Sequence, residues 1–139
     1  MTHLIRDWMT PNPITINGDN TLSVAYNLMR INSVRHLPVI NDNEKLVGVL
    51  TWGDVREARP KASGSDGQNA EWESHFLAAI RDVSEFMTPT PQTASASMPI
   101  AEAARLMMDQ KIGCLPIVEN GHIIGIVTEF DLYRYIVET

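Results

Sequence analysis

Two stretches of the chain carry a threonine and an aspartate at the same spacing, and their side chains can act together on a ligand. A glycine and two apolar residues precede Thr51, with Asp54 three positions later, and the same order leads to Thr128 and Asp131. A hydroxyl and a carboxylate at one helix entrance can hold the vicinal hydroxyls of a ribose, as an acidic residue does in dinucleotide-binding folds. The pair is also a helix-capping signal, since Thr is a good N-cap and a first-turn carboxylate favours the helix dipole. Taken singly, each motif indicates a cap rather than a site.

The segments around the two motifs are repeated along the chain. Met9-Thr10-Pro11 recurs as Met87-Thr88-Pro89, an offset of 78 (87 − 9), and Leu37-Pro38 recurs as Leu115-Pro116 at the same offset. The offset falls to 77 (128 − 51) at the Thr-x-x-Asp motifs, so one residue is lost in the turn between. Two copies over so long a period indicate a duplicated domain, because a solenoid needs at least three units.

Each half is predicted to run strand, helix, strand, strand, helix. In the first half we expect a strand at 14–16, a helix from Asp19 or Asn20, strands at 36–40 and 45–50, and a closing helix from Thr51. In the second half we expect a tight hairpin turn at 119–121 and a last helix from Glu129 nearly to the end. Between the halves, residues 60–69 have loop composition, and an amphipathic helix is predicted from the spacing of Trp72, Phe76, Ile80, Val83 and Met87.

Composition excludes several classes of protein. The chain has 139 residues, of which 44% are hydrophobic, so it can bury a core. Its net charge of −6 argues against a nucleic-acid surface, which needs a clustered basic face. The single cysteine, Cys114, cannot form an internal disulfide, reads as a small buried hydrophobe and fits a reducing compartment. Neither a signal peptide nor a run of about 20 apolar residues is seen, so we expect a cytoplasmic protein without membrane contact.

Catalytic and metal-binding patterns are missing from the sequence. No nucleophile–base pair, phosphate-cradling glycine loop or paired catalytic carboxylates can be found, so we predict that the chain is not an enzyme. His3, His75 and His122 show no metal-ligand spacing with one another or with Cys114, so we predict no metal site.

The ordered pair of complete copies resembles the tandem CBS domain pair, often called a Bateman module. The resemblance rests on the Met-Thr-Pro stretches, on Val34 to Val39 and Ile112 to Ile117, and on the two Thr-x-x-Asp motifs. It implies an α/β (α+β) fold of two pseudo-symmetric β-α-β-β-α repeats packed sheet to sheet. We place the first repeat at residues 4–59, a linker with an amphipathic helix at 60–82, and the second repeat at 83–138.

The resemblance also implies two clefts between the repeats and assigns residues to them. The ribose of an adenosine-containing ligand would be held by Thr51 with Asp54 and by Thr128 with Asp131. The base would lie near Pro13, Ile14, Pro91 and Gln92.

Phosphate groups would meet Arg35 and His36, just before Leu37-Pro38. Arg35 read alone is equally a solvated strand-edge charge, and His36 equally a half-buried histidine. The second repeat has the uncharged Gly113 and Cys114 at these positions. We therefore expect the cleft reached by Arg35 and His36 to bind phosphorylated ligands better, with His36 adding attraction below a pKa near 6.5 if unperturbed.

These features predict a regulatory module that senses an adenosine-containing ligand. We expect AMP, ADP or ATP in preference to S-adenosylmethionine or NAD, and no required cofactor. The alternative is a structural dimerisation or interaction module with vestigial clefts. Retention of both Thr/Asp pairs favours ligand binding, since a bare cap does not demand Asp twice. We also expect a homodimer formed through Trp72, Phe76 and the closing helices, and an effector protein that the sequence does not identify.

Overall fold

Each half of the chain folds in the predicted order of elements in the computed structural model, which describes residues 2–58 and 78–139. The first half comprises β2 (Ile16–Asn17), α2 (Leu22–Asn32), β3 (His36–Ile40), β4 (Leu46–Thr51) and α3 (Trp52–Glu57). The second half comprises α5 (Ile100–Gln110), β6 (Cys114–Glu119), β7 (His122–Thr128) and α6 (Glu129–Glu138). Its first strand is reduced to a single parallel bridge between Ala94 and Ile117.

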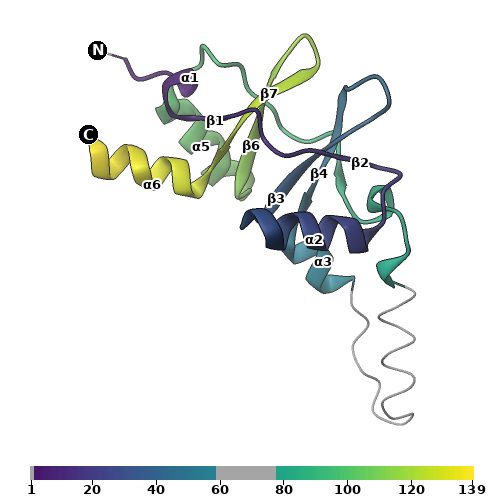
Figure 1. Cartoon of the computed structure of the whole chain (residues 1–139). Coiled ribbons are helices and arrows are strands. Elements are labelled where there is room, and N and C mark those ends of the chain that lie inside the picture. The colour runs from purple at the N-terminus through teal and green to yellow at the C-terminus, as the bar shows by residue number, and fades with distance from the viewer. Residues whose placement is uncertain (1, 59–77) are drawn as a thin grey trace.

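The two lead-in segments exchange places between the halves. The first contains α1 (Ile5–Trp8) and β1 (Thr10–Pro11), and the second contains η1 (Val83–Glu85) and β5 (Thr88–Pro89). β1 pairs antiparallel with β7 of the second half, and β5 pairs with β4 of the first. The sheets therefore run β1-β7-β6 and β2-β3-β4-β5, and Figure 1 shows the chain crossing from one to the other between β1 and β2. Each Thr-x-x-Asp motif thus lies beside the lead-in segment of the other half.

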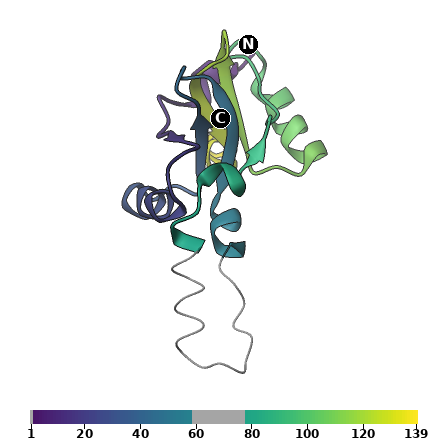
Figure 2. The same cartoon turned by 90° about the vertical axis from the view of Figure 1, so that its right-hand side faces the viewer.

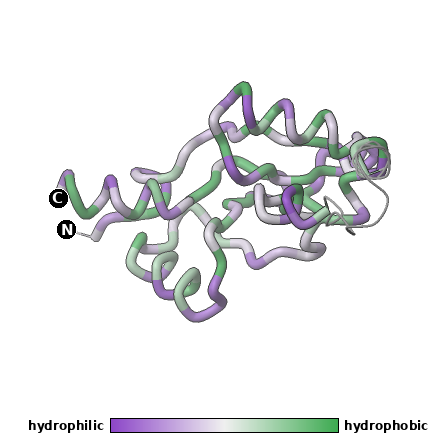
Figure 3. Tube along the Cα trace, turned by 90° about the horizontal axis from the view of Figure 1, so that it is seen from below, coloured by the Kyte–Doolittle hydropathy of each residue, from purple (hydrophilic) through white to green (hydrophobic). Residues whose placement is uncertain are grey.

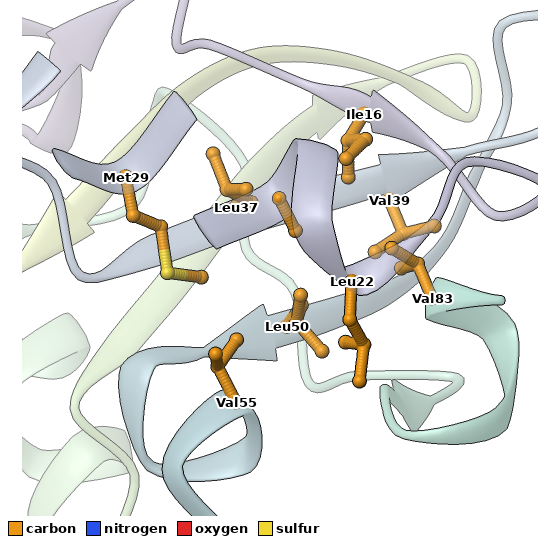
Figure 4. Close-up of a cluster of buried hydrophobic side chains, with 9 residues drawn as sticks. Ile16, Leu22, Met29, Leu37, Val39, Leu50, Val55 and Val83 are labelled. Atoms are coloured by element: carbon orange, nitrogen blue, oxygen red, sulfur yellow. The ribbon is translucent and has the colours of Figure 1, made fainter. Parts of the chain in front are cut away.

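Hydrophobic burial explains this exchange. Leu37 and Leu50 lie in the first core cluster together with Val83, which comes from the second lead-in segment (Figure 4). The second cluster likewise buries Ile5 of the first lead-in segment against Leu115. Because burying such a side chain contributes about 1.5–3 kcal/mol, each lead-in segment is held by the opposite core.

The two sheets pack against each other through a third, smaller cluster. Val49 of β4, Cys114 of β6 and Ile126 of β7 are buried together between the halves. At the hairpin ends, the Leu46 amide donates to the Gly121 carbonyl at 3.2 Å. Figure 2 shows α2 and α5 on opposite sides of the paired sheets. The predicted fold of two pseudo-symmetric repeats packed sheet to sheet is confirmed.

Two predicted boundaries in the first repeat are wrong by a few residues. The strand expected at 14–16 forms as β2 at Ile16–Asn17, and the helix expected from Asp19 or Asn20 begins at Leu22. The reason is local, because the Asn20 amide closes a turn on the Asn17 carbonyl at 3.0 Å. Thr21 then caps the helix by accepting a hydrogen bond from the Val24 amide.

The amphipathic helix predicted up to Met87 is interrupted in its described part. Trp72 and Phe76 lie outside the described residues. The Val83 amide donates to the Asn20 carbonyl at 2.8 Å, so the chain leaves the helical path and η1 takes its place. Ile80 is 52% exposed whereas Val83 is fully buried, so the prediction that these two residues share one apolar stripe is wrong.

Candidate functional site

Both Thr-x-x-Asp motifs cap a helix. The Thr51 amide donates to Asp54 Oδ2 at 2.8 Å, and the Asp54 amide donates to Thr51 Oγ1 at 3.1 Å. In the second copy the Thr128 amide donates to Asp131 Oδ2 at 2.8 Å, and the Thr128 hydroxyl lies 3.4 Å from the same oxygen. The capping interpretation is therefore confirmed for both copies. Each cap uses Oδ2 and leaves Oδ1 available for another partner.

The glycine of each motif has a packing role. Met87 lies over Gly48, and a Cβ added at Gly48 would overlap the Met87 sulfur. Met9 lies over Gly125 in the same way. Only a residue without a side chain lets the lead-in strand approach this closely. The motif glycines therefore place β5 and β1 directly beside the threonines.

A cleft of about 220 Å³ lies between the halves on the Thr51 side, and we call it the Thr51 cleft. Its polar lining consists of His36, Thr51, Thr88, Gln92 and Lys111. The remaining lining consists of Val49, Pro91, Ile112, Gly113, Cys114 and Pro116. Asp54 stands next to it, because its amide is bonded to Thr51 and its charge acts on His36. An apolar cleft with a few convergent polar groups is typical of a small-molecule site.

A larger hollow of about 320 Å³ lies between α2 and α3, lined in part by Leu22, Tyr26 and Val55. It is bordered by Ala58 and Ala78, next to residues that the structure does not describe. Its lining is apolar apart from Ser23 and the tyrosine hydroxyl, and it holds none of the predicted site residues. The Thr51 cleft is therefore the better candidate.

The predicted base-binding residues separate into two places. Pro91 and Gln92 line the Thr51 cleft, because β5 carries them to the first repeat. Pro13 and Ile14 lie on the crossover between β1 and β2, and Ile14 packs against the first core cluster. The structure thus brings the second pair, and not the first, together with Thr51.

The predicted phosphate-binding residues also separate. His36 lines the Thr51 cleft, whereas Arg35 is exposed and does not contribute to its lining. Gly113, the counterpart of Arg35, does line the cleft. The positive charge in the cleft comes instead from Lys111, which sequence reasoning missed.

Lys111 occupies a position that the sequence does signal. It is the C-cap of α5 in the left-handed conformation, with φ 55°. Its counterpart Ser33 caps α2 with φ 54°. The backbone has the same conformation at this position in both repeats, so the repeats differ here in the side chain alone. A search of the whole turn before each Leu-Pro, beyond the two residues directly before it, would have found the lysine.

His36 is neutral near pH 7. Burial lowers its pKa from the ordinary 6.5, and the Arg35 charge lowers it further, whereas Glu129 and Asp54 act in the opposite direction with less total effect. Because the pKa of His36 lies below the unperturbed value, any attraction of phosphate by a protonated His36 begins at a lower pH than the sequence suggests. His36 can still donate or accept one hydrogen bond as a neutral imidazole.

Cys114 is a buried structural residue. Burial raises the pKa of its thiol to about 12, so the thiol remains protonated and unreactive at neutral pH. Its prediction as a small buried hydrophobe is confirmed. Within residues 2–58 and 78–139, no group of three or more His, Cys, Asp or Glu side chains is arranged to hold a metal ion.

Asp131 differs from Asp54 in its surroundings. Its side chain is buried with 1% exposure, and its Oδ1 accepts a hydrogen bond from the Thr10 hydroxyl at 3.1 Å. Arg134 Nη2 lies 3.9 Å from the same oxygen. Asp54 is only partly buried, and its Oδ1 has no hydrogen-bond partner among the described residues. The two predicted ribose sites are thus not equivalent.

The fold and the cleft define a duplicated α/β module whose two repeats each complete the other's sheet. Comparison with known sequences identifies the repeats, because residues 5–61 and 81–138 each match the CBS domain. The chain belongs to the CBS domain family, and its two repeats form a tandem CBS pair, or Bateman module.

Similar proteins include small and large chains. A CBS domain-containing protein of Dictyostelium discoideum is 32% identical over 99% of this chain and 94% of its own length. Relatives that are named as enzymes match over a small part of their length. The homoserine O-acetyltransferase of Methanococcus vannielii, for example, is 29% identical, and this chain covers 23% of it.

Two solved structures of similar fold contain adenosine compounds. CBSX2 in complex with AMP is 29% identical, with a TM-score of 0.79 over 98% of this chain and 97% of that one. The CBS domain pair of MJ0100, in complex with 5-methylthioadenosine and S-adenosyl-L-methionine, is 25% identical, with a TM-score of 0.81 over 99% and 98% of the two chains. Another structure of CBSX2, from Arabidopsis thaliana, is 28% identical, with a TM-score of 0.81 over 99% of this chain and 96% of that one.

Proposed function

We propose that this chain is a regulatory module that binds an adenosine-containing ligand, AMP, ADP or ATP, in the Thr51 cleft. The observation that carries the proposal is the convergence of two halves on one cavity. Thr51 from the first repeat meets Pro91, Gln92 and Lys111 from the second. Complexes of similar modules with AMP and with S-adenosyl-L-methionine support the same class of ligand.

Each part of the ligand has a matching group in the cleft. Asp54 Oδ1, which has no partner among the described residues, would accept a hydrogen bond from a ribose hydroxyl, while Oδ2 continues to accept the capping bond from the Thr51 amide. Pro91 and Ile112 offer apolar surface to the base, and Gln92 can hydrogen-bond to its edge. Lys111 would meet the phosphate as a flexible point charge.

Regulation follows from the position of the cleft between the repeats. A ligand there contacts residues from both halves, so it binds tightly only when the halves have one relative arrangement. It can shift an equilibrium only by its difference in affinity for the two arrangements. The output would pass to an effector protein or through self-assembly.

We also propose that the module is a homodimer formed through α6. Phe130, Tyr133, Ile136 and Val137 of this helix are each at least 60% exposed, although they are large and apolar. Figure 3 shows the helix extending from the body with both hydrophobic and hydrophilic segments out to its end. A purely structural dimerisation module would use the same face and would need no ligand.

The described residues contain no helix that is both long and apolar enough to cross a membrane. Because the single cysteine is buried and unpaired, we propose a cytoplasmic location.

A thermal-shift experiment separates the sensing module from the structural one. A ligand that binds only the folded state must raise the melting temperature, by an amount that grows with its concentration. We expect AMP, ADP or ATP to do so, and S-adenosylmethionine and NAD to act less. If none of the five raises the melting temperature at millimolar concentration, the proposed function is wrong.

A further inference from the structure

We infer that the Asp131 site is closed by the chain's own Thr10, so that the module binds one nucleotide, at the Thr51 cleft. The identity of the nucleotide rests on the proposed function, but the contact between Thr10 and Asp131 does not depend on any ligand. Asp54 and Asp131 occupy equivalent positions in the duplicated fold, yet their contacts differ.

The backbone around the two aspartates is the same. Thr10 is paired with Ile126 in one sheet and Thr88 with Val49 in the other, so the two threonines occupy matching positions. The side chains nevertheless behave differently. The Thr10 hydroxyl donates to Asp131 Oδ1 at 3.1 Å, whereas Thr88 makes no such bond to Asp54. Thr10 therefore takes the position at Oδ1 that a ligand hydroxyl would need.

A difference in sequence accounts for the difference in contacts. Arg134 follows Asp131 by three residues on α6, and the matching residue on α3 is Glu57 (134 − 77). Arg134 Nη2 lies 3.9 Å from Asp131 Oδ1 and donates to the Trp8 carbonyl at 2.8 Å. The positive charge of Arg134 compensates the buried carboxylate of Asp131. The negative charge of Glu57, at the same spacing from Asp54, instead favours a carboxylate that remains hydrated.

Arg134 also ties the closing contact to the first lead-in segment. Its guanidinium lies over the Trp8 ring, 5.2 Å from the centroid. Trp8 in turn packs edge-on against Tyr135, with centroids 5.1 Å apart. Thr10 is only two residues away from Trp8, so α6 holds the strand that carries the closing hydroxyl. We call this set of residues, Trp8, Thr10, Asp131 and Arg134, the latch.

The number of AMP molecules bound per chain is measured by calorimetric titration. The wild type should bind one AMP per chain. Thr10→Ala removes the hydroxyl and leaves space, so a second AMP should bind. Thr10→Ser keeps the hydroxyl and should still bind one. Two AMP per chain in the wild type, or one in Thr10→Ala, would overturn the inference.

A second measurement needs no ligand and decides the matter even if the proposed function fails. A double-mutant cycle with Thr10→Ala and Asp131→Asn, followed by urea unfolding, should show coupling between the two residues. The matching cycle with Thr88→Ala and Asp54→Asn should show none. Equal coupling in both cycles, or none in the first, would show that the latch does not exist.

Discussion

At the scale of single residues, the charge of the Thr51 cleft depends on Lys111. The protein has a net charge of −6, so an approaching phosphate meets a repulsive background field. His36 is neutral at pH 7 because burial lowers its pKa. Among the residues that line the cleft, Lys111 therefore provides the attraction at neutral pH.

Replacing Lys111 should affect phosphorylated ligands selectively. We expect Lys111→Ala to weaken the binding of AMP by about 1 kcal/mol and to leave the binding of adenosine nearly unchanged. The loss is small because the lysine side chain is exposed and its charge is screened by solvent. Arg105→Ala on the exposed face of α5 removes the same charge and should have little effect on either. Calorimetry with both ligands measures the difference, and an equal loss for AMP and adenosine would show that Lys111 does not contact phosphate.

The lowered pKa of His36 predicts a pH dependence of stability. The folded state binds a proton at His36 less readily than the unfolded chain does, so the unfolded state holds more protons below pH 6.5. The free energy of unfolding should therefore fall as pH decreases from 7.5 through 6.5, and further until the folded-state pKa is passed.

Urea unfolding at pH 7.5 and 5.5 measures this effect. His36→Gln should reduce the fall in stability, because it removes the group whose pKa differs between the folded and unfolded states. An unchanged pH dependence in His36→Gln would contradict the burial of a neutral imidazole at this position.

Residue chemistry shows how far the site was predictable. Thr51, Pro91 and Gln92 were predicted from the family resemblance, and all three lie at one cleft. The repeat supports Thr51 and Pro91, whose counterparts are Thr128 and Pro13, whereas the counterpart of Gln92 is Ile14. Arg35 was expected beside His36, but it lies in the bend before β3, where its side chain is exposed and does not line the cleft. Lys111 has no counterpart among the charged residues of the first repeat, so a comparison of the repeats did not reveal it.

At the scale of elements, the exchanged lead-in strands depend on a glycine in each repeat. Met9 covers Gly125, and Met87 covers Gly48, at a separation that no side chain allows. The exchange itself was not predictable from the sequence, since each lead-in segment matches the repeat that follows it. Only the pairing of β1 with β7 shows that it completes the other sheet.

A methyl group at these glycines should destabilise the fold. Gly125→Ala forces Met9 away from β7, and overpacking of this kind costs about 1–3 kcal/mol. Gly53→Ala is the matched control, because a Cβ there meets only Thr51 Oγ1 at 3.5 Å and alanine favours a helix. We expect urea unfolding to show a loss for the first variant and none for the second. Equal stability of both variants would show that Met9 moves freely.

At the scale of the whole molecule, the exposed apolar face of α6 predicts self-association. Tyr133→Glu places a charge in the middle of this face and should convert a dimer into a monomer. Ser97→Glu adds the same charge on an exposed loop before α5 and should leave the dimer intact. Light scattering at micromolar concentration gives the mass, and a monomeric wild type would exclude this assembly.

The duplicated architecture was predictable because two copies of one pattern constrain each other. The hairpin turn at 119–121 and the start of α6 at Glu129 fall at the predicted residues, since Gly121 and the Thr128 cap specify them locally. The inequality of the two aspartates was not predictable. It depends on Arg134 and Thr10, which lie 124 residues apart (134 − 10) and meet only in the folded molecule.

The most direct test of ligand binding at the Thr51 cleft is the affinity for AMP of two variants of α3. Asp54→Asn and Glu57→Gln each remove one negative charge from the same helix, but only Asp54 stands beside Thr51. Calorimetry should show that Glu57→Gln binds AMP like the wild type and that Asp54→Asn loses about 1.5–3 kcal/mol, at least tenfold in affinity. Equal affinity of Asp54→Asn and the wild type would contradict the account.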